Sequence, residues 1–167
     1  MVIATDMALH FEHFEKFKTM IEYDGLDLTE ENNKTFLMWI LLHFSDLTNP
    51  SKQWFESYKW AWLVYEEFFV QGDKEKELGL PVGMFNDRKT INLADAQIGY
   101  ITVFIQPSFN ALSLLLPHVK IQWEYLQSNF EKWKQMKDEC KKIKDDGNDL
   151  IKVFNQLDEQ ANNYKTP

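Results

Sequence analysis

The sequence predicts an all-α protein, and three observations lead to that class. Apolar residues recur at helical spacing, as they do at Ile3, Met7, Phe14, Phe17 and Ile21. No stretch alternates apolar and polar residues in the manner of a β-strand. The 167 residues are 44% apolar and 15% aromatic, which is enough to bury a sizeable core. We therefore expect a multi-helix bundle.

Two helices are predicted before residue 43. Residues 2–22 have the spacing of an amphipathic helix, which Gly25 and the polar run 26–34 bring to an end. The run Phe36–Leu42 is apolar on all sides and predicts a buried helix. It is the longest apolar run and is too short to cross a bilayer, so no membrane span is expected.

A helix start is predicted at Asn49-Pro50, because Asn favours the capping position and Pro fits the first helical turn. This helix is rich in tryptophan and phenylalanine. It is expected to stop near Gly72, because glycine is unfavourable inside a helix. Residues 73–91 have mixed polarity with further Gly and Pro, and predict a short helix followed by a loop.

The remaining helices follow from proline positions and apolar spacing. A helix is predicted to start near Asn92 and to bend at Pro107, which lacks a backbone donor and crowds the preceding turn. Pro117 should end that segment. A long amphipathic helix is expected over residues 119–133, and the apolar pattern fades beyond it.

Composition excludes several classes of function. The net charge of −8 argues against non-specific binding to nucleic acid or to an acidic membrane. The single cysteine, Cys140, excludes an internal disulfide and fits a reducing compartment, so a cytoplasmic location is expected. Asp6 and His10 interrupt the N-terminal apolar stretch, so no signal peptide is expected.

Spacing alone indicates little chemistry. Asp6, His10 and His13 would share one face of a helix and could form a metal cluster, although a helix flank with partly exposed imidazoles is the favoured interpretation. Asp46 alone would be assigned to a cap or turn, which aspartate favours. No phosphate loop, zinc ribbon or nucleophile elbow is found.

Five stretches of the sequence, taken in order, carry a specific resemblance to a known protein family. They resemble the C-terminal half of the catalytic domain of class I 3′,5′-cyclic-nucleotide phosphodiesterases, over residues 1–133, and their spacing matches as well. Residues 134–167 lie beyond the resemblance and are expected to be an added helical tail. The five stretches are "ATDMALH" (4–10), "HFSDLTNPSK" (43–52), "EEFFVQGDKEKELGLP" (66–81), "DRKT" (87–90) and "AQIGYITVFIQP" (96–107).

The resemblance implies a two-metal mechanism in which a hydroxide attacks phosphorus while the 3′ oxygen leaves. The metals would be a zinc-like ion together with magnesium or manganese, and they would lower the pKa of water and neutralise phosphoryl charge. Asp46 matches the fourth protein ligand of the zinc-like metal. The family's general acid and its other ligands belong to motifs that this sequence lacks, so no catalytic residue is assigned and the chain alone is expected to be inactive.

The resemblance also implies a purine pocket. Gln97 matches a glutamine whose amide can donate to and accept from a purine edge. Tyr100, where the family usually has phenylalanine, would stack on the purine face. Val64 would close the opposite side, with Phe68 on the same wall. Asn49 matches a residue that contacts the purine in members selective for cAMP.

Met7 matches a pocket-lining methionine, and Asp6 matches a polar residue near the family's catalytic histidine. For Met7, Val64 and Phe68, a plain core position is an equal alternative to a place in the pocket. The stretch "GMFND" (83–87) departs from the family pattern, which puts the shape of the pocket there in doubt.

The expected function is therefore part of a phosphodiesterase that hydrolyses cAMP, and less favourably cGMP, to the 5′-monophosphate. Its partners would be a cyclic nucleotide and the missing N-terminal half of the domain or a larger assembly. One alternative is a catalytically inactive truncated relative that serves as a structural or nucleotide-sensing subunit. Another is a helical interaction module that keeps only the fold.

Overall fold

The structure, a computed structural model, describes residues 2–138 and confirms the all-α class, with no strand in that range. Short 3-10 or π-helical segments connect the longer helices. The 3-10 segments are η1 (Val2–Thr5), η2 (Met7–Leu9), η4 (Asn49–Ser51) and η6 (Pro117–Val119), and the π-helical ones are η3 (Met20–Asp24) and η5 (Ile101–Ile105). The α-helices are α1 (His10–Thr19), α2 (Glu31–Asp46), α3 (Trp54–Glu77), α4 (Leu93–Tyr100), α5 (Gln106–Leu115) and α6 (Lys120–Gln135).

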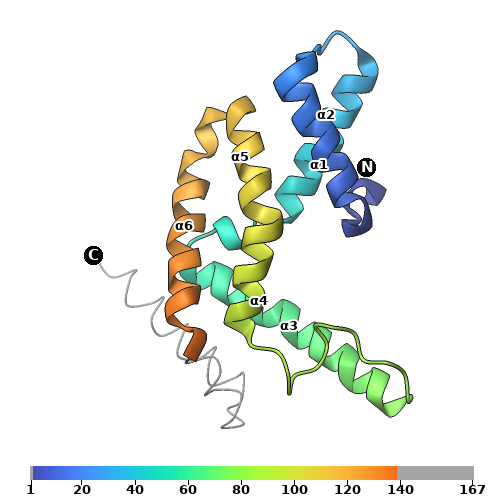
Figure 1. The fold of residues 1–167 in the computed structure, drawn as a ribbon, viewed down its shortest axis with the longest axis vertical. Helices are drawn as coiled ribbons and strands as arrows, with labels where there is room; N and C mark the ends of the chain where they lie inside the picture. Colours follow the sequence, from blue (N-terminus) through green and yellow to red (C-terminus); the bar gives the residue numbers. More distant parts are fainter. Residues whose placement is uncertain (1, 139–167) are drawn as a thin grey trace.

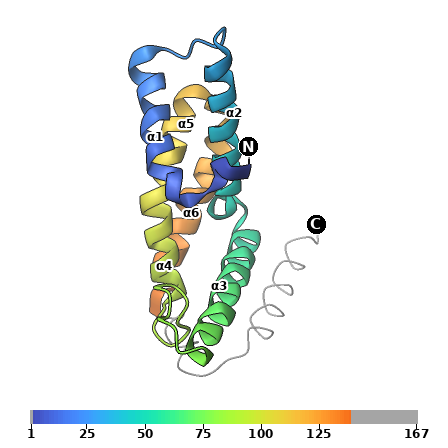
Figure 2. The ribbon, with the colours of Figure 1, turned by 90° about the vertical axis from the view of Figure 1, so that its right-hand side faces the viewer.

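The helices are arranged around one long column. Figure 1 shows α4, η5 and α5 running end to end, with α6 returning beside them. The pair α1 and α2 lies against the α5 end of this column, and α3 extends away at the α4 end. Figure 2, turned by 90°, shows the same separation of the α1–α2 pair from α3.

Two apolar clusters hold this arrangement together. The larger cluster lies between α3, the α4–η5 column and α6, and its innermost side chains include Ile101, Leu126 and Trp133. The smaller cluster joins α1, α2 and α5 around Phe17 and Ile40. Burial of such side chains is the main favourable contribution to folding.

The predicted helix over residues 2–22 is wrong in its first part. Asp6 is extended and caps η2, where its carboxylate accepts a hydrogen bond of 2.9 Å from the Ala8 backbone N–H. Such a side-chain bond competes with a continuous helix, because it satisfies the backbone donor locally. Regular α-helix therefore begins only at His10.

The expected helix end at Gly72 is also wrong, since α3 continues to Glu77. A Cβ at Gly72 would overlap the backbone carbonyl oxygen of Asn86, in the loop that leads to α4. The glycine therefore allows close approach of the loop and does not end the helix. The end comes at Gly79, whose φ of 68° suits a residue just past a helix C-terminus.

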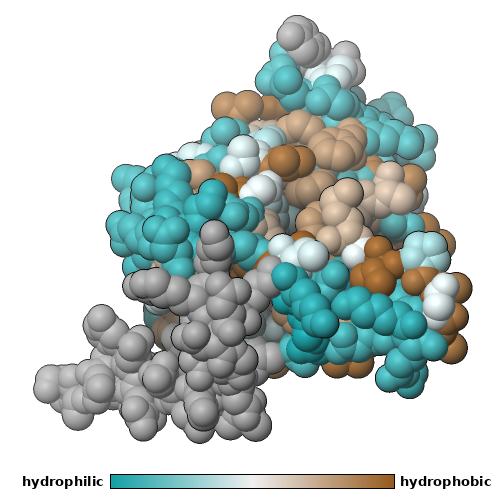
Figure 3. Space-filling view, turned by 60° about the horizontal axis from the view of Figure 1, so that its bottom comes forward, coloured by the Kyte–Doolittle hydropathy of each residue, from teal (hydrophilic) through white to brown (hydrophobic). Residues whose placement is uncertain are grey.

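The expectation that Phe36–Leu42 is buried on all sides is wrong as well. Within α2, Phe36, Ile40 and Phe44 are buried, one turn apart. Met38, Trp39 and Leu42 point away from this line and are exposed. In Figure 3, apolar side chains gather in a patch across the face shown, with polar residues around it. Several large apolar side chains of the described residues are at least 36% exposed. Seven of them, which we call the exposed apolar residues, are Phe11, Met38, Trp39, Leu42, Trp60, Leu63 and Val103.

The start near Asn92 and the end before Pro117 are confirmed: the Asn92 side chain caps α4 by accepting from the Asp95 backbone N–H, and α5 ends at Leu115. The helix continues through Pro107, which lies in the first turn of α5, and the turn before it is the π-helical η5. The bend at Pro107 stays a prediction.

The run Leu93–Leu115 has 23 residues with a mean hydropathy of 1.3, so it could cross a membrane by length and composition alone. In this fold it packs on α6 and supplies core side chains. The expectation of no membrane span stays a prediction. Most of the expected tail, residues 139–167, lies outside the described residues.

Candidate nucleotide and metal site

Asp46 is the last residue of α2, and its side chain is exposed. It makes no side-chain hydrogen bond to a described residue, so the capping alternative is not realised. The C-terminal end of a helix carries a partial negative charge, which disfavours a carboxylate. Local structure therefore gives no reason for an aspartate here. The free carboxylate suits a metal ligand.

A buried histidine pair lies near Asp46: His43 is on α2, three residues before Asp46, and His10 begins α1. Nδ1 of His10 and Nε2 of His43 are 2.9 Å apart, and both rings are almost fully buried. Burial, reinforced by the nearby charges of His43 and His13, lowers the pKa of His10 to about 4. Burial also lowers the pKa of His43, while the negative charge of Asp46 opposes that change. The pair is therefore neutral at neutral pH, with one ring donating to the other.

The alternative metal cluster of Asp6, His10 and His13 is not formed. Asp6 is used as a cap, and the His13 ring lies edge-on to Phe36 with ring centroids 6.0 Å apart. Within residues 2–138, no group of three or more His, Cys, Asp or Glu side chains is placed to hold a metal. Among the described residues, Asp46 therefore stays a single candidate ligand, as the resemblance implies.

The purine-edge candidate, Gln97, is 7% exposed on α4. No described residue hydrogen-bonds its side-chain amide, so both its donor and its acceptor remain available. Tyr100 lies one turn later, half-buried, with its ring centroid 5.7 Å from that of Phe104. Burial raises the pKa of the Tyr100 hydroxyl, and the charge of Asp46 raises it further. The stacking candidate and the metal-ligand candidate are thus within electrostatic reach of each other.

The opposite wall comes from α3, which packs on α4. Val64 and Phe68 are one turn apart on this helix, and both are half-buried. Phe68 leans on the larger core cluster and contacts Tyr65 with ring centroids 5.5 Å apart. Neither side chain is sealed in the core, which leaves part of each for a ligand.

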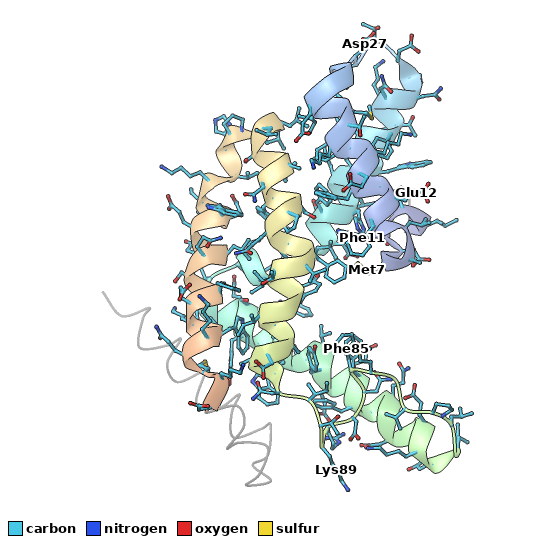
Figure 4. The ribbon with its side chains drawn as sticks, in the orientation of Figure 1. Met7, Phe11, Glu12, Asp27, Phe85 and Lys89 are labelled. Atoms are coloured by element: carbon cyan, nitrogen blue, oxygen red, sulfur yellow. The ribbon has the colours of Figure 1, made fainter. Side chains whose placement is uncertain are left out.

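Met7 lies in η2 and is 39% exposed, so it is not a plain core residue. In Figure 4, Met7 and Phe11 lie at the edge of the α1–α2 pair that faces α3, and Phe85 lies below them beside α3. Phe11 also contacts Phe104, with ring centroids 5.5 Å apart. Phe104 in turn contacts Tyr100, so it links the Met7 segment to the stacking candidate.

Two features escaped the sequence analysis. The His10–His43 bond joins residues 33 apart, and no local spacing indicates it. Phe104 carries three aromatic contacts, to His10, Phe11 and Tyr100, but its sequence signal is only that of an apolar helix position. The last candidate, Asn49, is half-buried in the turn η4 between α2 and α3.

Comparison with known proteins agrees with this geometry. An all-α fold in which the amide of Gln97 lies one helical turn from the aromatic ring of Tyr100 defines a candidate nucleotide-binding helical domain. The chain belongs to the 3′5′-cyclic nucleotide phosphodiesterase family, whose family model matches residues 1–126. The family is one of enzymes, as the names of the relatives state.

Individual relatives and a solved structure are similar over most of this chain. It is 41% identical over 113 residues to the human dual specificity calcium/calmodulin-dependent 3′,5′-cyclic nucleotide phosphodiesterase 1B, which is 68% of this chain and 20% of that protein. The human 1C relative is 38% identical over 113 residues, which is 15% of its length. A solved structure of LmjPDEB1 in complex with IBMX has a TM-score of 0.76 and 33% identity, and the match covers 83% of this chain and 42% of that one. The chain therefore spans a fifth or less of these curated relatives.

Proposed function

We propose that this chain forms the purine-binding side of a cyclic-nucleotide phosphodiesterase that hydrolyses the 3′,5′-phosphodiester of cAMP to the 5′-monophosphate. The observation that carries the proposal is Gln97, whose side chain is only 7% exposed and whose amide makes no hydrogen bond to a described residue but still reaches the surface. An amide that is largely enclosed but open at its hydrogen-bonding atoms can exchange water for a ligand at little cost, so a ligand is expected to use both its donor and its acceptor. In a chain of this family, the matching ligand is a purine edge.

Each candidate residue then has a role. Gln97 would bind the purine edge, Tyr100 would stack on its face, and Val64 and Phe68 would close the other side. Asp46 would hold a zinc-like metal, whose chemistry when bound is Lewis-acid activation of water and neutralisation of phosphoryl charge. The general acid and the other metal ligands would come from the N-terminal half of the catalytic domain, which the 167 residues do not include.

A second candidate function is acceptance of both cAMP and cGMP without preference. Adenine and guanine present opposite donors and acceptors at the positions that a glutamine amide contacts. An amide fixed by a neighbour would distinguish them by about ten- to hundred-fold, since each mismatch leaves ~1–3 kcal/mol of polar burial uncompensated. No described residue fixes Gln97, and the 1B and 1C relatives are named dual specificity enzymes. The resemblance at Asn49 favours cAMP instead.

The test measures binding of cAMP, cGMP and IBMX to the 167-residue chain. NMR chemical-shift changes and calorimetry would report the binding. Gln97→Ala is expected to weaken binding of both nucleotides at least tenfold. Gln122→Ala, which removes an exposed glutamine on α6, is the control and should leave binding unchanged. Turnover would be measured after co-expression with the upstream part of the human 1B catalytic domain. Equal binding by wild type and Gln97→Ala would refute the pocket.

A further inference from the structure

The turn η4, which carries Asn49, is held by one side chain from α6. Asn129 is 1% exposed, and its amide nitrogen donates to the backbone carbonyl oxygens of Pro50 and Lys52, both at 2.8 Å. These partners are 79 and 77 residues away in the sequence. A single buried amide therefore binds the middle of the turn, at Pro50, and the residue that follows it, Lys52.

The chemistry of the turn explains why an amide is needed. Backbone bonds within it run from Ser51 N–H to the Thr48 carbonyl and from Lys52 N–H to the Asn49 carbonyl. The Pro50 and Lys52 carbonyls receive the two hydrogens of Asn129. A neutral amide can supply two hydrogens from one nitrogen, whereas an aspartate carboxylate would place lone pairs against both carbonyls.

An aromatic contact strengthens the same junction. Trp133, one helical turn after Asn129, is fully buried and lies 5.1 Å from Trp54 and 5.3 Å from Tyr58, measured between ring centroids. These two aromatic residues belong to the first turns of α3. Helix α6 thus fixes both the turn and the start of the helix that follows it.

The turn is also rigidly joined to the end of α2. The Thr48 hydroxyl donates to the Ser45 carbonyl at 2.7 Å, and the Ser51 hydroxyl donates to the Thr48 carbonyl at 2.8 Å. Asp46 lies between Ser45 and Thr48, in the segment that the first of these bonds closes. A displacement of the turn would therefore be passed to both Asp46 and Asn49.

We propose that Asn129 is a positioning residue for Asn49 and, through the end of α2, for Asp46. It touches neither a nucleotide nor a metal, and it acts by setting where the turn lies. This inference rests on the proposed function for its consequence, but its structural part can be tested without any ligand.

The ligand-free test is NMR on the 167-residue chain. In the wild type, hydrogen-bond scalar couplings should connect the Asn129 amide nitrogen to the Pro50 and Lys52 carbonyl carbons. In Asn129→Ala, amide exchange at Ser51 and Lys52 should accelerate about tenfold or more. Asn86→Ala, which removes a buried amide at the far end of α3, is the matched control and should leave those two rates within twofold. Absent couplings or equal acceleration by both variants would overturn the proposal.

The functional test is a double-mutant cycle on cAMP affinity. Asn129→Ala should weaken binding about tenfold, and it should have less than twofold further effect once Asn49 is alanine, because both changes then remove the same contact. Asn86→Ala should combine additively with Asn49→Ala. Additive behaviour of Asn129→Ala would overturn the positioning role. If the wild type binds no cyclic nucleotide, the proposed function fails, and the NMR result alone decides whether Asn129 fixes the turn.

Discussion

Replacing His10 by glutamine is expected to reduce the acid sensitivity of the fold. The His10 ring is 1% exposed, so solvent screens it little. Burial and the charges of His43 and His13 lower its pKa from 6.5 to about 4. Between these values the unfolded chain binds a proton that the folded chain excludes. Stability is therefore lost as the pH falls through this window and is fully present above it.

The size of the effect follows from the two pKa values. A difference between 6.5 and about 4 corresponds to ~3 kcal/mol once the pH is below both values. Lowering the pH from 7 to 5 should remove about 2 kcal/mol of this. Burial and the charge of His13 lower the pKa of His43, whereas the charge of Asp46 and a hydrogen bond with the Thr5 backbone raise it. The lowered pKa of His43 therefore adds a loss of the same sign.

Urea unfolding followed by circular dichroism between pH 7.5 and 4.5 would measure this. The wild type should lose stability steeply on acidification, and His10→Gln should lose about 2 kcal/mol less between pH 7 and pH 5. His118→Gln changes an exposed histidine of η6 and serves as the control. The reasoning is refuted if His10→Gln keeps the full wild-type dependence on pH, or if His118→Gln removes it equally.

Three further outcomes are expected. The chain alone should not hydrolyse cAMP or cGMP with zinc and magnesium, because within residues 2–138 no group of three or more potential ligands is placed to hold a metal; turnover that Asp46→Ala abolishes would contradict this. The exposed apolar residues predict self-association or a larger assembly, so a monodisperse monomer with cooperative unfolding in sedimentation and melting experiments would count against it. Gly72→Ala should lower the free energy of unfolding in urea by at least ~3 kcal/mol, because its Cβ would overlap the Asn86 carbonyl. Gly99→Ala should raise it by ~0.5–1 kcal/mol, because Gly99 lies in a helix with open space around the added Cβ. Equal effects of the two alanines would show that the loop does not approach Gly72 closely.

Elements with strong local signals were predicted from the sequence. Asn92 caps a helix as its position suggested, and the apolar stripe of α6 is buried at Leu126 and Trp133. Gly72 was misjudged because its role depends on a loop that folds back onto α3, and helix propensity contains no information about that loop. The all-round burial of α2 failed for a similar reason, since the sequence does not show how many neighbours a helix has.

The site was only partly accessible from the sequence. Gln97 and Asp46 were found through resemblance, and residue spacing alone would have treated both as ordinary polar positions. The structure adds that the Gln97 side chain is largely enclosed and makes no hydrogen bond to a described residue, and that the Asp46 carboxylate is exposed and caps no helix. The histidine pair and the Asn129 bonds are tertiary contacts between distant segments, so neither helical periodicity nor capping rules could predict them.

The position of Asp46 leads to a prediction in which stability and function change in opposite directions. Its carboxylate lies at the C-terminal end of α2, where the helix dipole disfavours negative charge, and no hydrogen bond to a described residue offsets this. Asp46→Asn should therefore stabilise the metal-free fold by ~0.3–1 kcal/mol in urea unfolding while removing the proposed metal ligand. Asp95→Asn is the matched control of opposite sign, because Asp95 lies in the first turn of α4 and pairs with Lys137 at 2.7 Å. A loss of stability in Asp46→Asn would mean that the carboxylate has a structural role, and that its exposure at this helix end needs no metal to explain it.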